Sequence, residues 1–246
     1  MRRCMLRVCV GGLALAWAAG VAALGANVIV NGDAEAGAGS ADGFAPVTIP
    51  GWTAVGPFLV VQYAAGAGFP GASDPGPPSR GLNFFAGGDG SDVTTATQVD
   101  DVSADAAAID TGTVTFALSG YLGGFADQRD NAMLTVNFRN AGSTILSTAS
   151  IGPVSNTDRG NATALLLRST TGTVPAGTRT VEVVLALTRL DGSYDDGYAD
   201  NLSLVLARGG PVAGVPIPAT SWPAVAALAC MLGWLARRGI VARRRA

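Results

Sequence analysis

The chain has 246 residues, contains no histidine and no lysine, and carries its three cysteines, Cys4, Cys9 and Cys230, close to its two ends. These absences exclude histidine-based triads, lysine Schiff-base chemistry, thiol nucleophiles in the central region and the usual zinc sites. Between the terminal segments, eight arginines face all 18 acidic residues, a net charge of −10. Such a surface disfavours binding to nucleic acid or to an anionic membrane.

Residues 1–26 have the organisation of a secretory signal peptide. Arginines at positions 2, 3 and 7 precede an apolar run over residues 8–24, and small residues at 25 and 26 offer a cleavage site. The alternative is an uncleaved membrane anchor, because the run is close in length to a full span. A strand-like segment that begins directly after Ala26 favours cleavage. We therefore expect an exported chain whose domain, lacking cysteines, is stabilised by packing or by a metal.

The region 27–206 is predicted to form an antiparallel β-sandwich. Apolar and polar residues alternate in the segments 113–118, 134–138, 181–187 and 202–206, which indicates strands with one buried face. Shorter strand candidates, separated by Gly and Pro turn signals, are 28–30, 58–63, 82–86, 93–99 and 164–168. Nine or ten short strands in one exported domain predict a jelly roll. The Gly- and Pro-rich segment 64–80 is expected to be a long loop.

Two short motifs stand at the ends of the predicted sandwich. Asn31–Glu35 (NGDAE) is followed by Gly51-Trp52, and Tyr198–Leu204 (YADNLSL) opens the last predicted strand. With these motifs the chain resembles the galactose-binding-like jelly rolls, a superfamily with many carbohydrate-binding modules, although Ala34 replaces the usual aromatic residue. The resemblance implies that the first turn and the final strand lie side by side and share a structural Ca²⁺, bound by Asp33, Glu35 and Asp200.

Calcium is chemically compatible with this region, because it takes six to eight oxygen ligands from carboxylates and carbonyls. The alternative is that Asp33 forms a turn and that Asp200 and Asn201 make side-chain turns before a strand. A second acidic segment, Asp191–Gly197, has the composition of a calcium loop. It lacks the spacing and the terminal glutamate of an EF-hand, so we interpret it as a solvated hairpin tip.

The acidic residues give little support to catalysis. A glycoside hydrolase needs a pair of carboxylates, and the glutamates are Glu35 and Glu182, the latter on the polar face of an alternating strand. Asp100 and Asp101 are adjacent in a strand, which sends their side chains to opposite faces. We therefore predict a protein that is not an enzyme, with a carboxylate-dependent glycoside hydrolase as the less favoured alternative.

Binding of sugars is the favoured class of function. Exported β-sandwiches bind sugars with aromatic faces and with polar side chains that hydrogen-bond to hydroxyls. Most aromatic residues, Trp52 above all, are expected in the core. The best candidate for an exposed contact is Phe125, in a loop that also holds Asp127, Gln128 and Arg129. We expect a protein that binds or scaffolds extracellular polysaccharide; the alternative is a structural matrix or adhesion protein without a specific sugar site.

Residues 207–246 have the organisation of a sorting tail. A Pro/Gly linker over residues 207–221 contains the motif Val215, Pro216, Ile217, Pro218 and Ala219, and residues 222–246 form a predicted transmembrane helix with an arginine-rich end. This order resembles the exosortase-type signals of the bacterial PEP-CTERM group, in the variant written VPLPA. The resemblance implies a membrane enzyme that cuts near the motif and passes the protein to the cell surface or extracellular matrix. The alternative is a permanent single-pass anchor.

Overall fold

The computed structural model describes residue 25 and residues 27–208. The predicted signal peptide, apart from Gly25, lies outside the described residues, as do the sorting motif at 215–219 and the predicted transmembrane helix at 222–246. Within the described part of the chain, no helix is long and apolar enough to cross a membrane. The last strand extends to Arg208, two residues beyond the predicted end of the sandwich.

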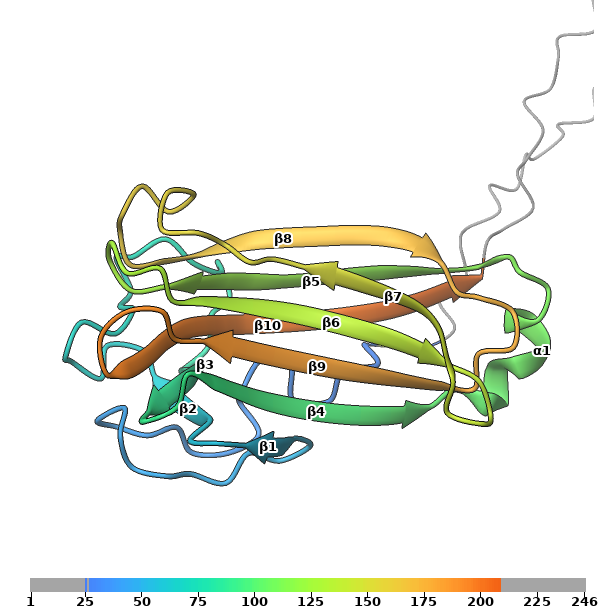
Figure 1. The fold of residues 1–246 in the computed structure, drawn as a ribbon, viewed down its shortest axis with the longest axis horizontal. Helices are drawn as coiled ribbons and strands as arrows, with labels where there is room; N and C mark the ends of the chain where they lie inside the picture. Colours follow the sequence, from blue (N-terminus) through green and yellow to red (C-terminus); the bar gives the residue numbers. More distant parts are fainter. Residues whose placement is uncertain (1–24, 26, 209–246) are drawn as a thin grey trace, which may run out of the picture. The chain divides into compact units, whose positions relative to one another are not determined.

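The described residues form two five-stranded antiparallel sheets packed face to face (Figure 1). The first sheet contains, in spatial order, β1 (Thr53–Val55), β4 (Val93–Asp101), β9 (Thr180–Thr188), β6 (Asn131–Arg139) and β7 (Ile145–Ile151). The second contains β2 (Leu59–Gln62), β3 (Asn83–Asp89), β10 (Tyr194–Arg208), β5 (Val114–Gly124) and β8 (Ala164–Thr173). One helical turn, η1 (Ser103–Asp105) and α1 (Ala106–Ile109), joins β4 to β5. The predicted antiparallel β-sandwich is therefore confirmed.

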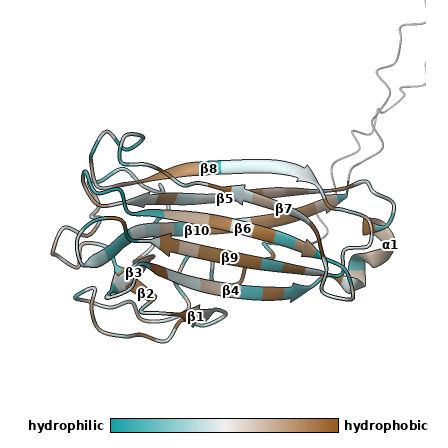
Figure 2. Ribbon diagram, viewed as in Figure 1, coloured by the Kyte–Doolittle hydropathy of each residue, from teal (hydrophilic) through white to brown (hydrophobic). Residues whose placement is uncertain are grey.

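The main core lies between the sheets and follows from the alternating strands. Hydrophobic residues recur along β6 and β9 (Figure 2), and every second residue of β9 from Val181 to Leu187 is buried. These side chains meet Leu202, Leu204 and Leu206 of β10 in one cluster. Trp52 belongs to the same cluster, as predicted, and donates its indole N–H to the Asn31 carbonyl over 3.1 Å.

A second hydrophobic cluster lies on the outer face of the second sheet, away from the main core. In β2 and β3 alternate residues belong to different clusters: Val60 and Phe85 face the main core, and Val61 and Phe84 face outward. We call the outward group the outer cluster; it consists of Leu59, Val61, Phe69, Phe84, Ala86, Leu165 and Tyr198, with Tyr63, Ala65, Tyr121, Phe125 and Tyr194 packed against it. The predicted loop 64–80 contributes Ala65 and Phe69 to this cluster. It also contacts the beginning of β8, where the Leu165 N–H donates to the Pro75 carbonyl over 2.9 Å.

The structure corrects the strand predictions in three places. Residues 28–30 do not form a strand; the Val30 N–H and carbonyl bind the side-chain amide of Gln98 instead of a neighbouring strand. β1 has no buried residue, and β7 has a single one, Ile151. Without a buried face neither segment acquires the alternation that marks a strand in the sequence, which explains why both were missed.

Candidate functional site

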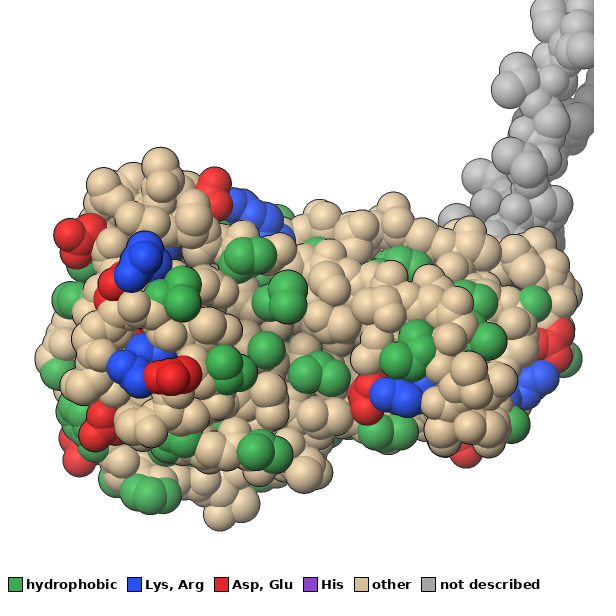
Figure 3. Space-filling view, in the orientation of Figure 1, with side chains coloured by type: hydrophobic (Ala, Val, Ile, Leu, Met, Phe, Trp, Pro, Cys, Tyr) green, Lys and Arg blue, Asp and Glu red, His purple; other side chains and the backbone are tan. Residues whose placement is uncertain are grey.

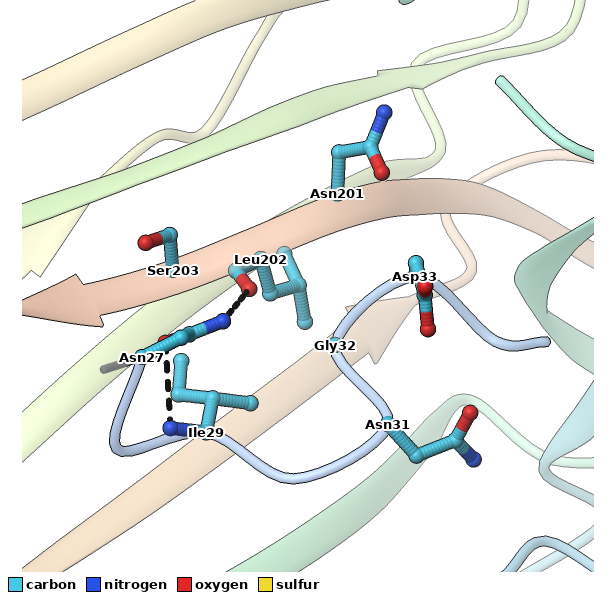
Figure 4. A pocket seen from close by; sticks show the side chains of 8 residues that line it. All are labelled: Asn27, Ile29, Asn31, Gly32, Asp33, Asn201, Leu202 and Ser203. Atoms are coloured by element: carbon cyan, nitrogen blue, oxygen red, sulfur yellow. Dashed lines mark hydrogen bonds between the residues drawn. The ribbon is translucent and has the colours of Figure 1, made fainter. Parts of the chain in front are cut away.

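The N-terminal turn lies beside β10, as the resemblance implied. The Leu202 N–H donates to the Gly32 carbonyl over 2.8 Å, and the Asn27 amide binds both the Leu202 carbonyl and the Leu204 N–H, at 2.9 and 2.8 Å. A Cβ atom on Gly32 would lie 2.2 Å from the Leu202 oxygen, so the close approach requires glycine. Figure 4 shows the pocket of about 330 Å³ between the two segments, with Asp33 and Asn201 at the end opposite Asn27.

Asp200 is a fully buried carboxylate in this region. Its Oδ2 accepts the Tyr63 hydroxyl over 2.7 Å, and its Oδ1 accepts the Asn201 N–H over 2.6 Å. Burial, with a smaller contribution from the charges of Glu35 and Asp33, raises the pKa of Asp200 to about 8 against the effect of these two bonds. In the described part of the chain Asp200 forms no ion pair with an arginine. A cation at this place would relieve the cost of its burial.

Glu35 and Asp33 approach Asp200 closely enough to raise its pKa, but their own oxygens face protein donors. Glu35 Oε1 accepts the N–H groups of Leu82 and Asn83, both over 2.7 Å, and Asp33 Oδ1 accepts the Glu35 N–H over 3.4 Å. Among the residues that the structure describes, no three His, Cys, Asp or Glu side chains form a group that could hold a metal ion. The donor chemistry fits calcium, and calcium binding stays a prediction.

The predicted sugar-binding loop lies at the end of β5. Phe125, expected to be exposed, is half-buried, because it packs against the outer cluster and against Gly68 in loop 64–80, where a Cβ atom would lie 2.4 Å from its ring. Asp127 and Arg129 are exposed and Gln128 is half-buried. The Arg129 guanidinium donates to Asp191 Oδ1 over 2.8 Å, which connects this loop to the β9–β10 turn. The four predicted residues therefore stay together on one short loop.

Buried Arg159 fixes the backbone of that loop. Its guanidinium donates to the carbonyl oxygens of Gly124, Ala126 and Ala162 over 2.8–2.9 Å and to that of Gln128 over 2.7 Å. Burial lowers the pKa of Arg159, because the charged form is desolvated. No sequence pattern indicates this role, because a lone arginine in a polar segment is typical of a solvated surface.

The acidic segment at the β9–β10 turn is the expected solvated tip only in its first part, where Gly192 and Ser193 are exposed. β10 begins at Tyr194, so Asp195 pairs with Gly88 of β3 and is fully buried beside Gly87. Burial raises the pKa of Asp195 to about 7 and that of Asp196 to about 6. The Asp195 Oδ2 atom has no hydrogen-bond partner among the described residues. Asp191, at the turn itself, forms the pair with Arg129.

The outer cluster gathers all four tyrosines of the chain, Tyr63, Tyr121, Tyr194 and Tyr198. Phe44, which the sequence analysis did not single out, is 55% exposed and packs edge-on against Tyr194 at a ring-centroid distance of 5.4 Å. A signal for this cluster exists in the sequence: β2 and β3 are apolar at consecutive positions, which indicates strands covered on both faces.

The two glutamates lie far apart in the fold, one on the first sheet and one in the N-terminal turn beside the second sheet. Glu182 is on the outer face of β9, where Asn137 donates to its Oε2 over 2.8 Å and Arg139 forms an ion pair with it. Glu35 is bound to the beginning of β3 in the other sheet. This arrangement does not resemble the facing carboxylates of a glycoside hydrolase.

No family model and no curated protein matches the chain. Among solved structures, it is similar to the enzymatically active domain of tailspike protein 4 of bacteriophage CBA120, with 16% identity over 72% of this chain and 21% of that one and a TM-score of 0.41. It is also similar to TmCBM61 in complex with β-1,4-galactotriose, with 11% identity over 72% of this chain and 97% of that one and a TM-score of 0.39. A third similar structure is the CBM22-1 xylan-binding domain of Paenibacillus barcinonensis Xyn10C, with 15% identity over 70% of this chain and 94% of that one and a TM-score of 0.38. Because these TM-scores lie below 0.5, our fold assignment depends on the strand pairing itself.

Proposed function

We propose that this chain is an exported, non-catalytic protein of jelly-roll type that binds extracellular polysaccharide on the outer face of its second sheet. The observation that carries the proposal is the outer cluster: four tyrosines and several phenylalanines gather outside the core of a protein in which only 7% of residues are aromatic. Phe69, Phe84 and Tyr198 are buried inside this cluster. The rings at its margin that reach the surface offer flat apolar faces on which sugar rings pack.

In this proposal the accessible aromatic rings contact the apolar faces of the sugar, and the neighbouring polar side chains hydrogen-bond to its hydroxyls. Phe44 is exposed, and Phe125 and Tyr194 are half-buried, so each presents part of a ring to solvent. Asp127 and Arg129 stand exposed on the loop of Phe125 and supply a carboxylate and a guanidinium for sugar hydroxyls. Arg159 holds the backbone of this loop in place, so that the groups are positioned before a ligand arrives.

The experiment is a binding assay of the full-length chain on an array of bacterial and plant polysaccharides. We expect retention on at least one glycan, and a loss of tenfold or more in affinity for Phe125→Ala and for Phe44→Ala, because each removes a stacking surface. The control is Val55→Ala, an exposed apolar residue on the first sheet, away from the outer cluster. Binding that survives both aromatic changes, or that Val55→Ala reduces equally, would exclude this site.

We further propose that Asp33, Glu35 and Asp200 bind a structural Ca²⁺. The full burial of Asp200 and its pKa of about 8 support the proposal, since a cation would stabilise the ionised form. The test is the thermal unfolding of the chain with Ca²⁺ and then with excess chelator. We expect the unfolding midpoint to be many degrees lower in chelator, and we expect no such difference in Asp200→Ala. Equal midpoints with Ca²⁺ and with chelator in the unmodified chain would rule out the site.

Delivery to the cell surface by an exosortase-type membrane enzyme is the last part of the proposal, and its support is the sequence of residues 215–246. Cleavage near Val215–Ala219 would release the protein from a transient membrane anchor. Mass spectrometry of the protein recovered from the cell surface tests this directly. A new C-terminus near the motif is expected, whereas an intact Ala246 would indicate the permanent anchor.

A further inference from the structure

Most arginines of the sandwich are neutralised by an acidic partner. Five of them form ion pairs: Arg129 with Asp191, Arg139 with Glu182, Arg168 with Asp158, Arg179 with Asp110 and Arg189 with Asp92. Figure 3 shows cationic side chains beside acidic ones toward both ends of the molecule. The negative charge of the domain therefore comes from the acidic residues outside these pairs, and their positions decide which ligands the surface attracts.

Two of these acidic residues lie beside the accessible rings of the outer cluster. Asp89 is exposed and is opposed to Tyr194 across β3 and β10, so their side chains share one face of the sheet. Asp42 is exposed, and its Oδ1 accepts the Phe44 N–H over 2.9 Å. The Tyr194 hydroxyl donates to the Gly43 carbonyl over 2.8 Å, which holds the segment of Asp42 against this ring. In the described part of the chain neither carboxylate forms an ion pair.

The acidic residues act on the Tyr194 hydroxyl. Burial raises the pKa of Tyr194 most, and negative charges raise it further, those of Asp196, Asp195, Asp89 and Asp42. A group that packs on this ring therefore meets a negative potential. Such a potential favours a cationic ligand and opposes an anionic one.

Another ring of the outer cluster already has a cation on its face. The Arg80 Cζ atom lies 5.1 Å from the centroid of the Tyr63 ring, a distance at which the π-electrons attract a cation. Among the residues that the structure describes, Arg80 is the one cation placed over an aromatic ring in this way. The pair of Phe44 and Tyr194, with carboxylates beside it, is thus suited to a cation that a ligand brings.

We propose that the polysaccharide bound at the outer cluster carries free amino groups, as a de-N-acetylated hexosamine polymer does. This inference rests on the proposed function and names the ligand class of the same site. The apolar face of a hexosamine ring packs on Phe44 and Tyr194, and its ammonium group lies beside Asp42 and Asp89, where it forms charge-assisted hydrogen bonds. A polymer of uronate, sulfate or phosphate groups would bring like charges together and is disfavoured.

The test compares sugars that differ in charge. The full-length chain, in mild detergent, is titrated with a glucosamine oligosaccharide, with its fully N-acetylated form and with a glucuronate oligosaccharide. Mildly acidic buffer keeps the sugar amines protonated and Asp42 ionised, since hydrogen bonds from Phe44 and Ala45 lower the pKa of Asp42 to about 2. We expect the glucosamine form to bind about tenfold more tightly than the N-acetylated form, and the glucuronate form not to bind. Equal or weaker binding of the glucosamine form would overturn the inference.

Variants that remove one charge locate the preference. Asp42→Asn and Asp89→Asn are each expected to lose most of the preference for the amine and to retain binding of the N-acetylated form, because the ring faces are unchanged. The matched control is Asp101→Asn, at the end of β4, since Asp101 is also exposed and its Oδ1 also accepts a backbone N–H, that of Ser103 over 2.8 Å. A preference that both outer-cluster variants leave intact, or that Asp101→Asn reduces equally, would contradict the site.

Two outcomes separate this inference from the proposed function. If the N-acetylated form binds through Phe44 and Phe125 but the amine is not preferred, the proposed function stands and this inference fails. If none of the oligosaccharides and no polysaccharide of the array binds, both fail.

Polylysine separates sugar recognition from attraction of charge alone, because it carries ammonium groups without sugar rings. We expect polylysine to bind more weakly than the glucosamine oligosaccharide, and we expect Phe44→Ala to reduce the binding of the sugar only. Polylysine binding that is as tight, and equally sensitive to Asp42→Asn, would show that charge alone is recognised and would overturn the inference.

Discussion

Arg159 shows how a single buried cation can organise a loop without an acidic partner. Its four hydrogen bonds go to backbone carbonyls, of which that of Gly124 belongs to a buried residue and the other three are closer to solvent. We expect Arg159→Met to lower the free energy of unfolding by about 2–4 kcal/mol, because an unsatisfied buried acceptor costs about 1–3 kcal/mol and solvent can reach part of the loop. Urea unfolding measures the change.

The control for this prediction is Arg168→Met, which removes a half-exposed ion pair with Asp158. Surface pairs of this kind contribute about 0–1 kcal/mol, so its effect should be small. Equal losses for the two variants would show that Arg159 contributes no more than an ordinary surface charge.

At Gly32, the methyl group of an alanine should push the N-terminal turn away from β10. A Cβ atom there would lie 2.2 Å from the Leu202 carbonyl oxygen. Gly32→Ala is expected to cost about 1–3 kcal/mol, the range typical of overpacking, because the turn must move away from β10. In Gly142→Ala the nearest atom lies at 3.4 Å, so this control should leave the unfolding midpoint almost unchanged. A Gly32→Ala chain as stable as the control would mean that the turn is not held against β10.

β10 concentrates buried acids in one element, and this predicts an unusual dependence of stability on pH. The pKa values of Asp195, Asp196 and Asp200 are raised to about 7, 6 and 8. Between pH 4 and these values the folded chain holds protons that the unfolded chain has released. Their stabilising contribution is therefore full below about pH 4 and is lost as the pH rises through about 6 to 8.

Thermal unfolding in chelator should accordingly show a midpoint that falls between pH 4.5 and 8.5. Below pH 4 the trend reverses, because Asp42 and Asp191 have pKa values lowered to about 2 by hydrogen bonds from Phe44 and from Arg129. Asp200→Asn removes one of the titrating groups and should flatten the decline. A midpoint that rises from pH 4.5 to 8.5 would mean that these acids are hydrated in solution.

The alternation of apolar and polar residues predicted the strands with one buried face, and short apolar runs between turn signals predicted β2 and β3. β5, β6, β9 and the second half of β10 alternate because each has the core on one side. The same pattern was misleading at residues 28–30, where the Val28 N–H donates to the Leu204 carbonyl and Val30 binds the Gln98 side chain, so that no strand forms. It could not reveal β7, where both faces are open, or the burial of Asp195, which depends on the distant Gly87. The two motifs predicted one part of the candidate site, the contact between the first turn and the last strand, which the structure shows at Gly32 and Leu202. They did not predict the packing of Phe125 against Gly68.

At the scale of the whole domain, the two hydrophobic clusters are distinct and contain different chromophores. Trp52 belongs to the main core, and the four tyrosines belong to the outer cluster. Phe69, from loop 64–80, is central to the outer cluster, because its ring lies 5.5–6.2 Å from those of Tyr194, Tyr198 and Phe84. In Phe69→Ala, we expect the near-ultraviolet circular dichroism of the tyrosines to disappear at a lower urea concentration than the one at which the Trp52 fluorescence changes.

The measurement uses the full-length chain with Trp17→Phe, Trp222→Phe and Trp234→Phe, so that Trp52 is the remaining tryptophan. The control is Phe138→Ala, in the main core, where the loss of a fully buried ring costs about 3–5 kcal/mol. Because β2, β3 and β10 belong to both clusters, unfolding of the core must also destroy the outer cluster, and both signals should shift together. Two coincident transitions in Phe69→Ala would show instead that the outer cluster and the core unfold as one unit, and that loop 64–80 cannot open while the sandwich stays folded.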